Sequence, residues 1–158
     1  MCTAISMINK DRCYFGRNMD IPFFFKQRPI YIPKRFKYLN RANGQTENIE
    51  RSILGMGSVI DGHPAMAEAM NEKGLACAGL NFAGYAHFGT DFIESKENIT
   101  PYDFILWALS KHDSIKQVKQ DIESINFVSI AINDKTPVSQ LHWMLCDRSG
   151  ASIVVECT

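Results

Sequence analysis

Apolar and polar residues form patterns typical of β-hairpins at both ends of the chain. Residues 3–8 and 13–17 are short segments rich in strand-forming side chains, and the polar residues between them predict a turn. Residues 141–147 and 152–156 have the same character and flank the turn sequence Arg148-Ser149-Gly150. We therefore predict a hairpin near each end.

The segments between these hairpins predict both strands and loops. Residues 52–60 predict a buried strand that the Asp61-Gly62 turn closes, and residues 75–82 predict another strand of small apolar residues. Between them, residues 65–73 are rich in helix-forming residues and end at Gly74, so we predict a short helix. The polar segment 40–50 predicts a loop, as does the segment 82–98, which has no period.

Two helices are predicted in the second half of the chain. Thr100 offers an N-cap that a proline follows, and the next residues have a wide apolar face, formed by Phe104, Ile105, Trp107, Ala108 and Leu109. Ser114 offers a second N-cap, and apolar residues recur after it at steps of three and four. Residues 127–132 alternate like a strand. No repeat or linker divides the chain, so we expect one α+β domain over residues 1–158.

The composition narrows the classes of partner. The chain has 158 residues, of which 46% are hydrophobic, and its 17 basic residues balance its 17 acidic ones. This composition is typical of a globular domain, and a zero net charge provides no positive field for nucleic acid or an acidic membrane surface. There is no apolar run of about 18 residues and no signal-peptide pattern at the start. We expect a cytoplasmic protein with a small-molecule partner.

The cysteines and histidines do not predict a disulfide framework or a metal site. The five cysteines are odd in number and widely separated, and the four histidines are scattered. No CxxC or HExxH motif occurs. Gly55-Met56-Gly57 resembles the start of a dinucleotide-binding loop, but Ile60 occupies the third glycine position. We expect no metal ion and no other cofactor.

Cys2 is the position most informative about chemistry. Removal of Met1 would leave its thiol beside a free α-amino group, and such an amine titrates at about 7.7–8.0. Part of the amine is then unprotonated at neutral pH and able to accept the thiol proton, so one residue would supply both nucleophile and base. The alternative is a cysteine that merely begins a strand.

Three further residues lie where they could assist that thiol. Arg17 and Asp20 come at the end of the second predicted strand, which the hairpin returns to the chain's first residues. They could orient the amine and favour the thiolate, or be a surface ion pair and a turn residue. Asn81 ends a strand of small residues, where its backbone N–H could donate to an oxyanion or the residue could simply suit a turn.

Several segments, taken in order, resemble the choloylglycine hydrolases, a family that includes bile salt hydrolases and penicillin V acylases. The segments that carry the resemblance are 1–5 (MCTAI), 15–20 (FGRNMD), 71–75 (NEKGL), 78–82 (AGLNF) and 141–143 (LHW). The resemblance extends over essentially the whole chain. It implies the four-layer αββα sandwich of N-terminal nucleophile hydrolases and the hydrolysis of a linear amide bond.

The resemblance also implies roles for individual residues. Cys2 resembles the nucleophile with its own amine as base, Arg17 and Asp20 resemble its polar partners, and Asn81 resembles an oxyanion-hole residue. Asparagine at this last position is typical of bile salt hydrolases, whereas many penicillin V acylases have tyrosine. The residues that match the wall of the apolar substrate pocket are Met19, Phe25 and Ile60.

The chain departs from the family at its end. Family members continue beyond the strand at 152–156 and carry there a second oxyanion-hole asparagine and a further arginine, so this chain is expected to be truncated. Three hypotheses remain open: hydrolysis of glycine- or taurine-conjugated bile salts, hydrolysis of penicillin V or another linear amide, and a catalytically silent remnant that binds amphipathic ligands or associates with itself. Unpaired strand edges lead us to expect a homo-oligomer.

Overall fold

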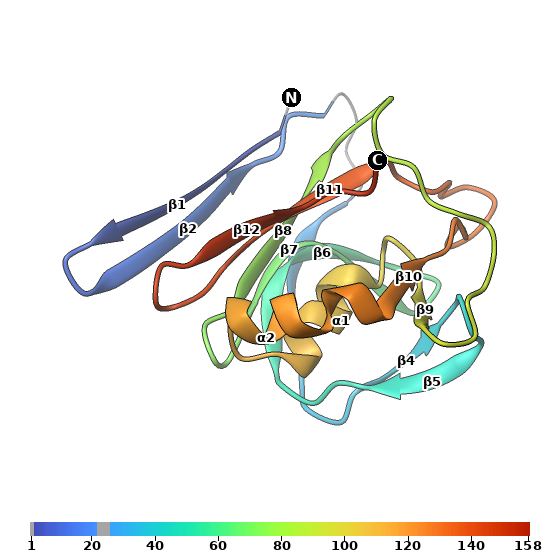
Figure 1. Cartoon of the computed structure of the whole chain (residues 1–158), viewed down its shortest axis with the longest axis horizontal. Helices are drawn as coiled ribbons and strands as arrows, with labels where there is room; N and C mark the ends of the chain where they lie inside the picture. Colours follow the sequence, from blue (N-terminus) through green and yellow to red (C-terminus); the bar gives the residue numbers. More distant parts are fainter. Residues whose placement is uncertain (1, 22–25) are drawn as a thin grey trace.

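The computed structural model describes residues 2–21 and 26–158, and its central element is a six-stranded antiparallel sheet (Figure 1). The strand order is β12-β11-β8-β7-β6-β3. The strands are β3 (Arg28–Ile32), β6 (Ile53–Ile60), β7 (His63–Asn71), β8 (Ala76–Asn81), β11 (Leu141–Cys146) and β12 (Ser152–Val155). The predicted hairpin of β11 and β12 is confirmed, and it forms one edge of the sheet.

Smaller elements surround this sheet. Two hairpins are formed by β1 (Thr3–Asn9) with β2 (Arg12–Asn18) and by β4 (Lys37–Asn40) with β5 (Gln45–Asn48). A short parallel pair joins β9 (Glu97–Ile99) to β10 (Ile125–Phe127). The helices are α1 (Phe104–Lys111), α2 (Ile115–Asp121) and the 3₁₀ turn η1 (Ile122–Ser124). The predicted N-terminal hairpin is confirmed as β1 and β2.

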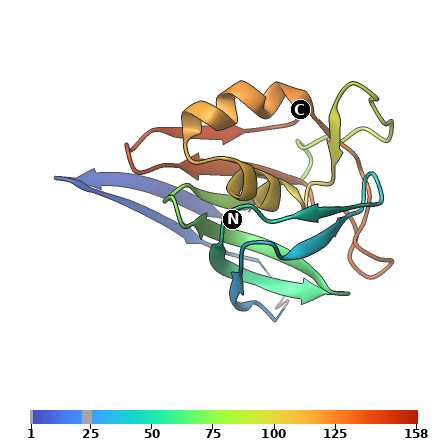
Figure 2. The same ribbon diagram turned by 90° about the horizontal axis from the view of Figure 1, so that it is seen from below.

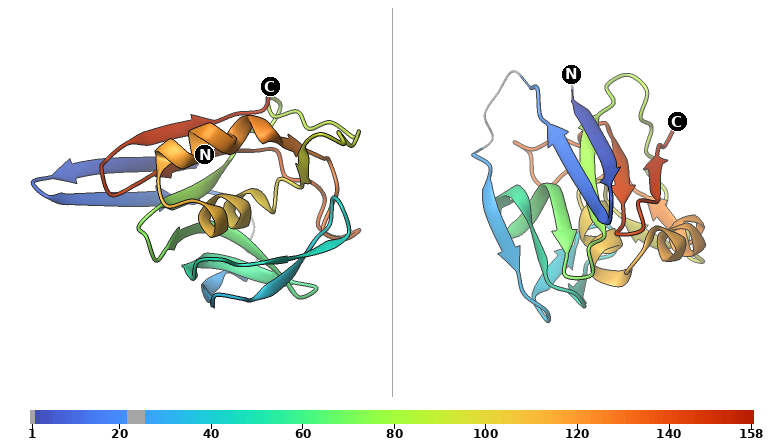
Figure 3. Two further views of the ribbon diagram at one scale, coloured as in Figure 1. Left: turned by 60° about the horizontal axis from the view of Figure 1, so that its bottom comes forward. Right: turned by 90° about the vertical axis from the view of Figure 1, so that its left-hand side faces the viewer.

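The helices and the β1–β2 hairpin lie on opposite faces of the six-stranded sheet (Figures 2 and 3). On one face, the Asn71 side chain donates hydrogen bonds to the Leu109 and His112 carbonyls at the end of α1, both at 2.8 Å. Glu68, an odd number of residues away on the same strand, points to the opposite face and contacts the hairpin. Helices, sheet and hairpin correspond to three layers of the expected αββα sandwich.

The core lies between α1 and the sheet. Its largest fully buried side chains are aromatic, namely Trp107, Trp143 and Phe104. The second predicted helix is confirmed: the Ser114 side chain accepts from the Gln117 N–H, and Asp147 accepts from the Ile115 N–H at 2.8 Å. These two acceptors satisfy donors that the helix itself leaves unpaired at its first turn. No helix in the described ranges is long and apolar enough to cross a membrane.

The helix predicted over residues 65–73 is wrong, because this segment belongs to the central strand β7. Alanine and methionine favour helices locally, but β7 pairs with β6 on one side and β8 on the other. The small side chains also suit a close approach: a Cβ at Gly55 of β6 would lie 2.1 Å from the Glu68 carbonyl oxygen. Gly74 adopts φ +85° in the turn between β7 and β8 and does not end a helix.

The loop predicted over residues 40–50 is also corrected, because most of it forms the β4–β5 hairpin. Asn43 and Gly44 form its turn, in which Gly44 has φ +71° and its N–H donates to the Asn40 carbonyl at 2.9 Å. Asn-Gly is a strong hairpin signal that the polar composition of the segment obscured. The strand expected over residues 127–132 is not found there: β10 ends at Phe127, and only an isolated bridge at Val128 follows in that range.

Candidate functional site

Cys2 lies at the open end of the β1–β2 hairpin. Its side chain is half-buried and its thiol is not part of a disulfide. The strand register pairs Thr3 with Asn18 and Ala4 with Arg17, so the first residues of the chain lie beside the last residues of β2. This is the proximity that the sequence predicted from two short strands and a turn. In Figure 1, β1 begins at the end of the molecule where β8 finishes.

Arg17 connects the hairpin to the six-stranded sheet. Its side chain is only 5% exposed, although arginine is rarely buried without partners. Nη1 donates to Glu68 of β7 at 3.0 Å, and Nη2 donates to the Gly79 carbonyl of β8 at 2.6 Å. Nε is buried and has no partner among the described residues. A single guanidinium therefore fixes β2 against two strands of the other layer.

Asn81 ends β8, and the strand pattern indicates where its backbone N–H points. The N–H of the next residue, Phe82, donates to the Gln140 carbonyl on the β11 side. Neighbouring residues of a strand direct their N–H groups to opposite sides, so the Asn81 N–H points to the β7 side. The β7–β8 pairing there ends with Glu68 and Ala78, three residues before Asn81. The N–H thus lies beyond the end of that ladder.

The same alternation relates Asn81 to Arg17. Gly79 lies two residues before Asn81, so its carbonyl points to the same side as the Asn81 N–H. That carbonyl is the one that accepts from the Arg17 guanidinium. This hydrogen bond therefore places Arg17, which lies opposite Ala4 on the hairpin, beside the end of β8. Of the residues singled out from the sequence, Arg17 and Asn81 are the two whose positions are most directly connected.

The remaining candidates lie around this place to different degrees. Asp20 is exposed and follows the end of β2 by two residues. Met19 is half-buried, and its sulfur accepts from the Gln27 side chain at 3.5 Å. Ile60 is half-buried at the end of β6, two strands away from β8 in the sheet. Phe25 lies outside the described residues.

Glu68 is a functional candidate that the sequence reasoning missed. It forms the ion pair with Arg17 and is 30% exposed. In the helix that the sequence predicts over residues 65–73, Glu68 would be an ordinary solvated charge. The available signal was that Glu68 is the single charged residue between Ala65 and Asn71. A lone acid in an apolar strand needs a cationic partner more than one in an exposed helix does.

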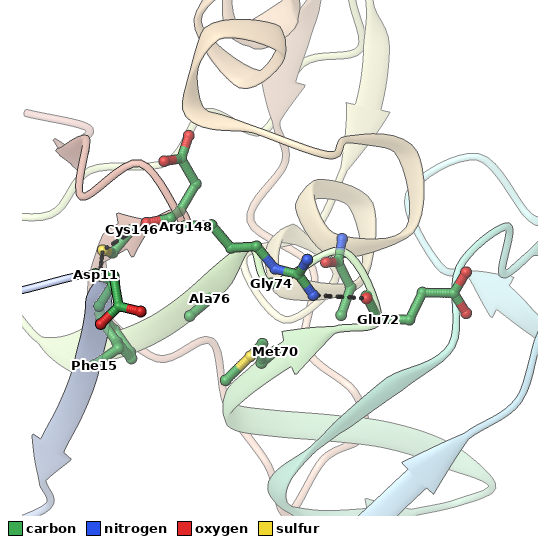
Figure 4. A pocket seen from close by; sticks show the side chains of 11 residues that line it. Asp11, Phe15, Met70, Glu72, Gly74, Ala76, Cys146 and Arg148 are labelled. Atoms are coloured by element: carbon green, nitrogen blue, oxygen red, sulfur yellow. Dashed lines mark hydrogen bonds between the residues drawn. The ribbon is translucent and has the colours of Figure 1, made fainter.

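A cavity of about 430 Å³ lies under the hairpin near its turn (Figure 4). It is lined by residues of β2 and the turn before it, of β7, β8 and the turn between them, and of the end of β11 and the turn after it, among them Asp11, Cys13, Phe15, Met70, Cys146 and Arg148. Cys2 is not among its lining residues. A second cavity of about 300 Å³ has a mostly apolar lining that includes Val59, the neighbour of Ile60. Among the described residues, no group of three or more His, Cys, Asp or Glu is arranged to hold a metal ion.

Relatives of known activity resemble the chain over its whole length. It is 45% identical over 159 residues to the bile salt hydrolase/transferase of Clostridium perfringens, covering 100% of this chain and 48% of that protein. It is 37% identical to the bile salt hydrolase/transferase of Lactiplantibacillus plantarum, covering 99% of this chain and 47% of that protein. The chain thus spans about half the length of the curated relatives it matches.

Solved structures agree with these matches. The C2A mutant of conjugated bile acid hydrolase from Clostridium perfringens superposes with a TM-score of 0.94 at 44% identity, over 100% of this chain and 48% of that one. Penicillin V acylase from Agrobacterium tumefaciens shares the fold, with a TM-score of 0.76 at 16% identity, over 99% of this chain and 46% of that one. The family model for linear amide C–N hydrolases, choloylglycine hydrolase family, matches residues 2–158. The chain therefore belongs to the choloylglycine hydrolase family.

Proposed function

We propose that this chain carries the nucleophile of an enzyme that hydrolyses the amide bond of glycine- or taurine-conjugated bile salts. The observation that carries the proposal is the bridge from Arg17 to the Gly79 carbonyl, which joins the hairpin that begins beside Cys2 to the strand that ends at Asn81. The similarity to bile salt hydrolases over the whole chain supports this substrate class. Asn81, rather than tyrosine, at the oxyanion position supports the same choice.

In the proposed reaction, removal of Met1 exposes the α-amino group of Cys2. This amine accepts the thiol proton while the sulfur attacks the amide carbonyl of the substrate. The carbonyl oxygen becomes an oxyanion, to which the Asn81 N–H donates. The α-ammonium then gives its proton to the leaving glycine or taurine nitrogen, and a thioester between Cys2 and the bile acid remains. Water attacks the thioester and releases the bile acid.

The charged neighbours have positioning roles in this proposal. Arg17 is held by Glu68 and the Gly79 carbonyl, so it fixes the hairpin rather than moving with the substrate. Asp20 would accept a hydrogen bond from the Cys2 α-amino group. Met19, Phe25 and Ile60 would contact the steroid, which needs an apolar wall. We further propose that the enzyme works in the reducing cytoplasm, where a thiol nucleophile persists.

The test follows the acyl group on Cys2. The chain is incubated with glycocholate, taurocholate and, separately, penicillin V, and mass spectrometry records the first residue, any acyl adduct and the released amine. We expect removal of Met1, a cholyl adduct on Cys2 and release of glycine or taurine. The Cys2→Ala variant should give neither adduct nor release, whereas the matched Cys157→Ala variant should give both.

Other outcomes contradict the proposal in distinct ways. An intact Met1 in an active sample, or an adduct on a different cysteine, removes Cys2 as the nucleophile. Adduct formation with penicillin V alone assigns the chain to acylases of other linear amides. Bile salt binding without any adduct on this chain supports a silent ligand-binding role.

Exposed apolar residues on the hairpin favour a second proposal, self-association into a homo-oligomer. Ile5, Met7 and Tyr14 are 60%, 53% and 46% exposed, and the register places Met7 directly opposite Tyr14. Ile5 lies two residues from Met7 and therefore on the same outward face. Contiguous exposed apolar side chains of this kind are typical of an interaction surface.

A further inference from the structure

Two thiols meet between the hairpin and the six-stranded sheet, away from Cys2. The sulfur of Cys13 on β2 lies 3.2 Å from the sulfur of Cys146 at the end of β11, although 133 residues separate them in sequence. Cys146 is buried, whereas Cys13 is half-buried. Both line the cavity near the turn of the hairpin, in which Figure 4 labels Cys146.

The hairpin and the β11–β12 turn are also in close contact beside this pair. A Cβ at Gly150, in the β11–β12 turn, would lie 2.0 Å from Cδ1 of Ile8 on the hairpin. Gly150 also has φ +82°, so the turn requires glycine on both grounds. The strand register of β1 with β2 places Ile8 opposite Cys13. The hairpin therefore meets the sheet at the thiol pair and at this neighbouring contact.

We propose that Cys13 and Cys146 form a reversible intramolecular disulfide that clamps the N-terminal hairpin to the six-stranded sheet when the protein meets a small-molecule disulfide oxidant. A disulfide needs sulfur atoms about 2.05 Å apart, so the two sulfurs must approach by about 1 Å. Side-chain rotation and a small movement of the hairpin supply this. The cavity gives a small oxidant access to Cys13.

The other cysteines are worse partners for Cys146. Cys77 pairs with Leu145 across β8 and β11, whereas Cys146 pairs with Ala76. Neighbouring residues of a strand point to opposite faces, so Cys77 points to the helix side and Cys146 to the hairpin side. Cys157 follows β12, where its carbonyl accepts from the His87 N–H. Cys13 is the thiol that the register brings to Cys146.

The exchange has two balanced steps with oxidised glutathione as the oxidant. The Cys13 thiolate attacks one sulfur of glutathione disulfide, whose S–S bond breaks, and one glutathione thiolate leaves. The Cys146 sulfur then attacks the Cys13 sulfur of the mixed disulfide, gives up its proton to water, and displaces the second glutathione. Two protein thiols are oxidised and one glutathione disulfide is reduced to two glutathione molecules.

The surroundings of Cys146 determine which thiol reacts first. Burial, and then the neighbouring Cys13, raise the pKa of Cys146 to about 11, so this thiol stays protonated at neutral pH. The more accessible Cys13 therefore makes the first attack, and the second step depends on deprotonation of Cys146. The rate of closure is expected to increase with pH between about 7 and 9, because the Cys146 thiolate fraction increases roughly tenfold per pH unit well below a pKa of about 11.

The test uses the Cys2→Ala background, which removes a competing thiol, and treats the folded chain with oxidised glutathione. We expect a product two hydrogen atoms lighter, peptide mapping that joins Cys13 to Cys146, and full reversal by a dithiol reductant. The oxidised chain should melt about 5 °C or more above the reduced one, because the bond constrains a long loop of the unfolded chain. The added variant Cys157→Ser should behave in the same way.

Cys13→Ser and Cys146→Ser should each lose the intramolecular product and retain a glutathione adduct on any accessible remaining thiol. Should either variant fail to fold, alkylation of the Cys2→Ala chain before and after oxidation still counts the two thiols lost. Each of three results would overturn the proposal. They are a disulfide between two molecules, a disulfide that joins another pair of cysteines, and wild-type chains whose five cysteines all remain free thiols after oxidation. Because these measurements record no turnover, they are independent of the proposed hydrolase activity.

Discussion

At the scale of single residues, Arg17 illustrates what the sequence could and could not predict. Its position at the end of the second strand, near Cys2, followed from a short hairpin pattern. Its actual partners, Glu68 and the Gly79 carbonyl, are 51 and 62 residues away. Such contacts depend on which strands of another layer lie beneath the hairpin, and no local pattern contains that information.

Arg17→Met is expected to reduce the free energy of unfolding by about 2 kcal/mol or more, because it leaves two acceptors without their donor. Urea unfolding followed by circular dichroism measures the change. The matched variant Arg12→Met, at an exposed position of the same strand, should change it by less than about 0.5 kcal/mol. In a Glu68→Gln background the cost of Arg17→Met should fall. Equal costs for the Arg17 and Arg12 variants would refute the bridging role.

A buried pair, His63 and Asp103, has opposing effects on stability. Burial, followed by the nearby Arg41 charge, lowers the pKa of His63 to about 4. Burial raises the pKa of Asp103 to about 6 despite its hydrogen bonds from Thr100. The His63 contribution is lost as the pH falls from about 6.5 to 4, whereas the Asp103 contribution is gained as the pH falls from about 6 to 4. We therefore expect the two pH dependences to oppose each other in the native protein.

Asp103→Asn should expose the His63 contribution alone. We expect this variant to lose up to about 3 kcal/mol of its unfolding free energy between pH 6.5 and 4 relative to its own value at pH 7, since one pKa unit corresponds to about 1.4 kcal/mol. The wild-type profile should be flatter, as should that of the exposed control Asp134→Asn. His63→Gln should instead gain stability as the pH falls. Parallel profiles for all four proteins would contradict the assignment.

At the scale of elements, the sequence predicted those whose signals are local. The terminal hairpins and the Ser114-capped helix were correct because their turn and cap residues act over a few positions. The helix predicted over residues 65–73 is wrong because pairing with β6 and β8, which depends on tertiary contacts, overrides the helix propensity of the segment. Ile60 already excludes Gly55 and Gly57 as a dinucleotide-binding loop in the sequence, and in the structure they serve the close approach of β6 to β7.

Gly55→Ala tests that close approach. The added methyl would lie 2.1 Å from the Glu68 carbonyl and 2.5 Å from the Ala69 side chain, so the two central strands must separate. We expect a loss of more than about 3 kcal/mol or no folded protein. Gly16→Ala is the control, because its methyl would meet only Ile5 at 3.9 Å. Thermal unfolding of both variants, with soluble yield, distinguishes them, and a Gly55→Ala chain as stable as the control would disprove the argument.

At the scale of the whole molecule, the three layers are unequally covered. One face of the six-stranded sheet packs against α1, and part of the other face lies under the hairpin, whose tip extends beyond the sheet (Figures 1 and 2). The outward side of the hairpin exposes Ile5, Met7 and Tyr14. The sequence predicted unpaired strand edges and exposed apolar surface. It did not predict that exposed apolar side chains would lie on the hairpin that carries Arg17.

Self-association through this outward side is expected to depend on concentration. Sedimentation velocity should show a monomer at low concentration and larger species at high concentration. Replacing Ile5→Lys and Met7→Lys together should shift the chain to monomer, because charges on the contact face are costly to bury. Tyr85→Lys, at an exposed loop position, should not. A monomer at all concentrations would exclude the association.

The contacts of the hairpin also determine when the chain can finish folding. β1 and β2 precede the residues on which they rest: Glu68 and Gly79 follow Arg17 by 51 and 62 residues, and Cys146 follows Cys13 by 133 residues. Until those later residues have folded, the hairpin has no surface to dock against, and docking between segments far apart in the sequence is slow. We therefore expect the hairpin to dock late in folding, although it precedes its partners in the sequence, and any chemistry at Cys2 to begin only after that.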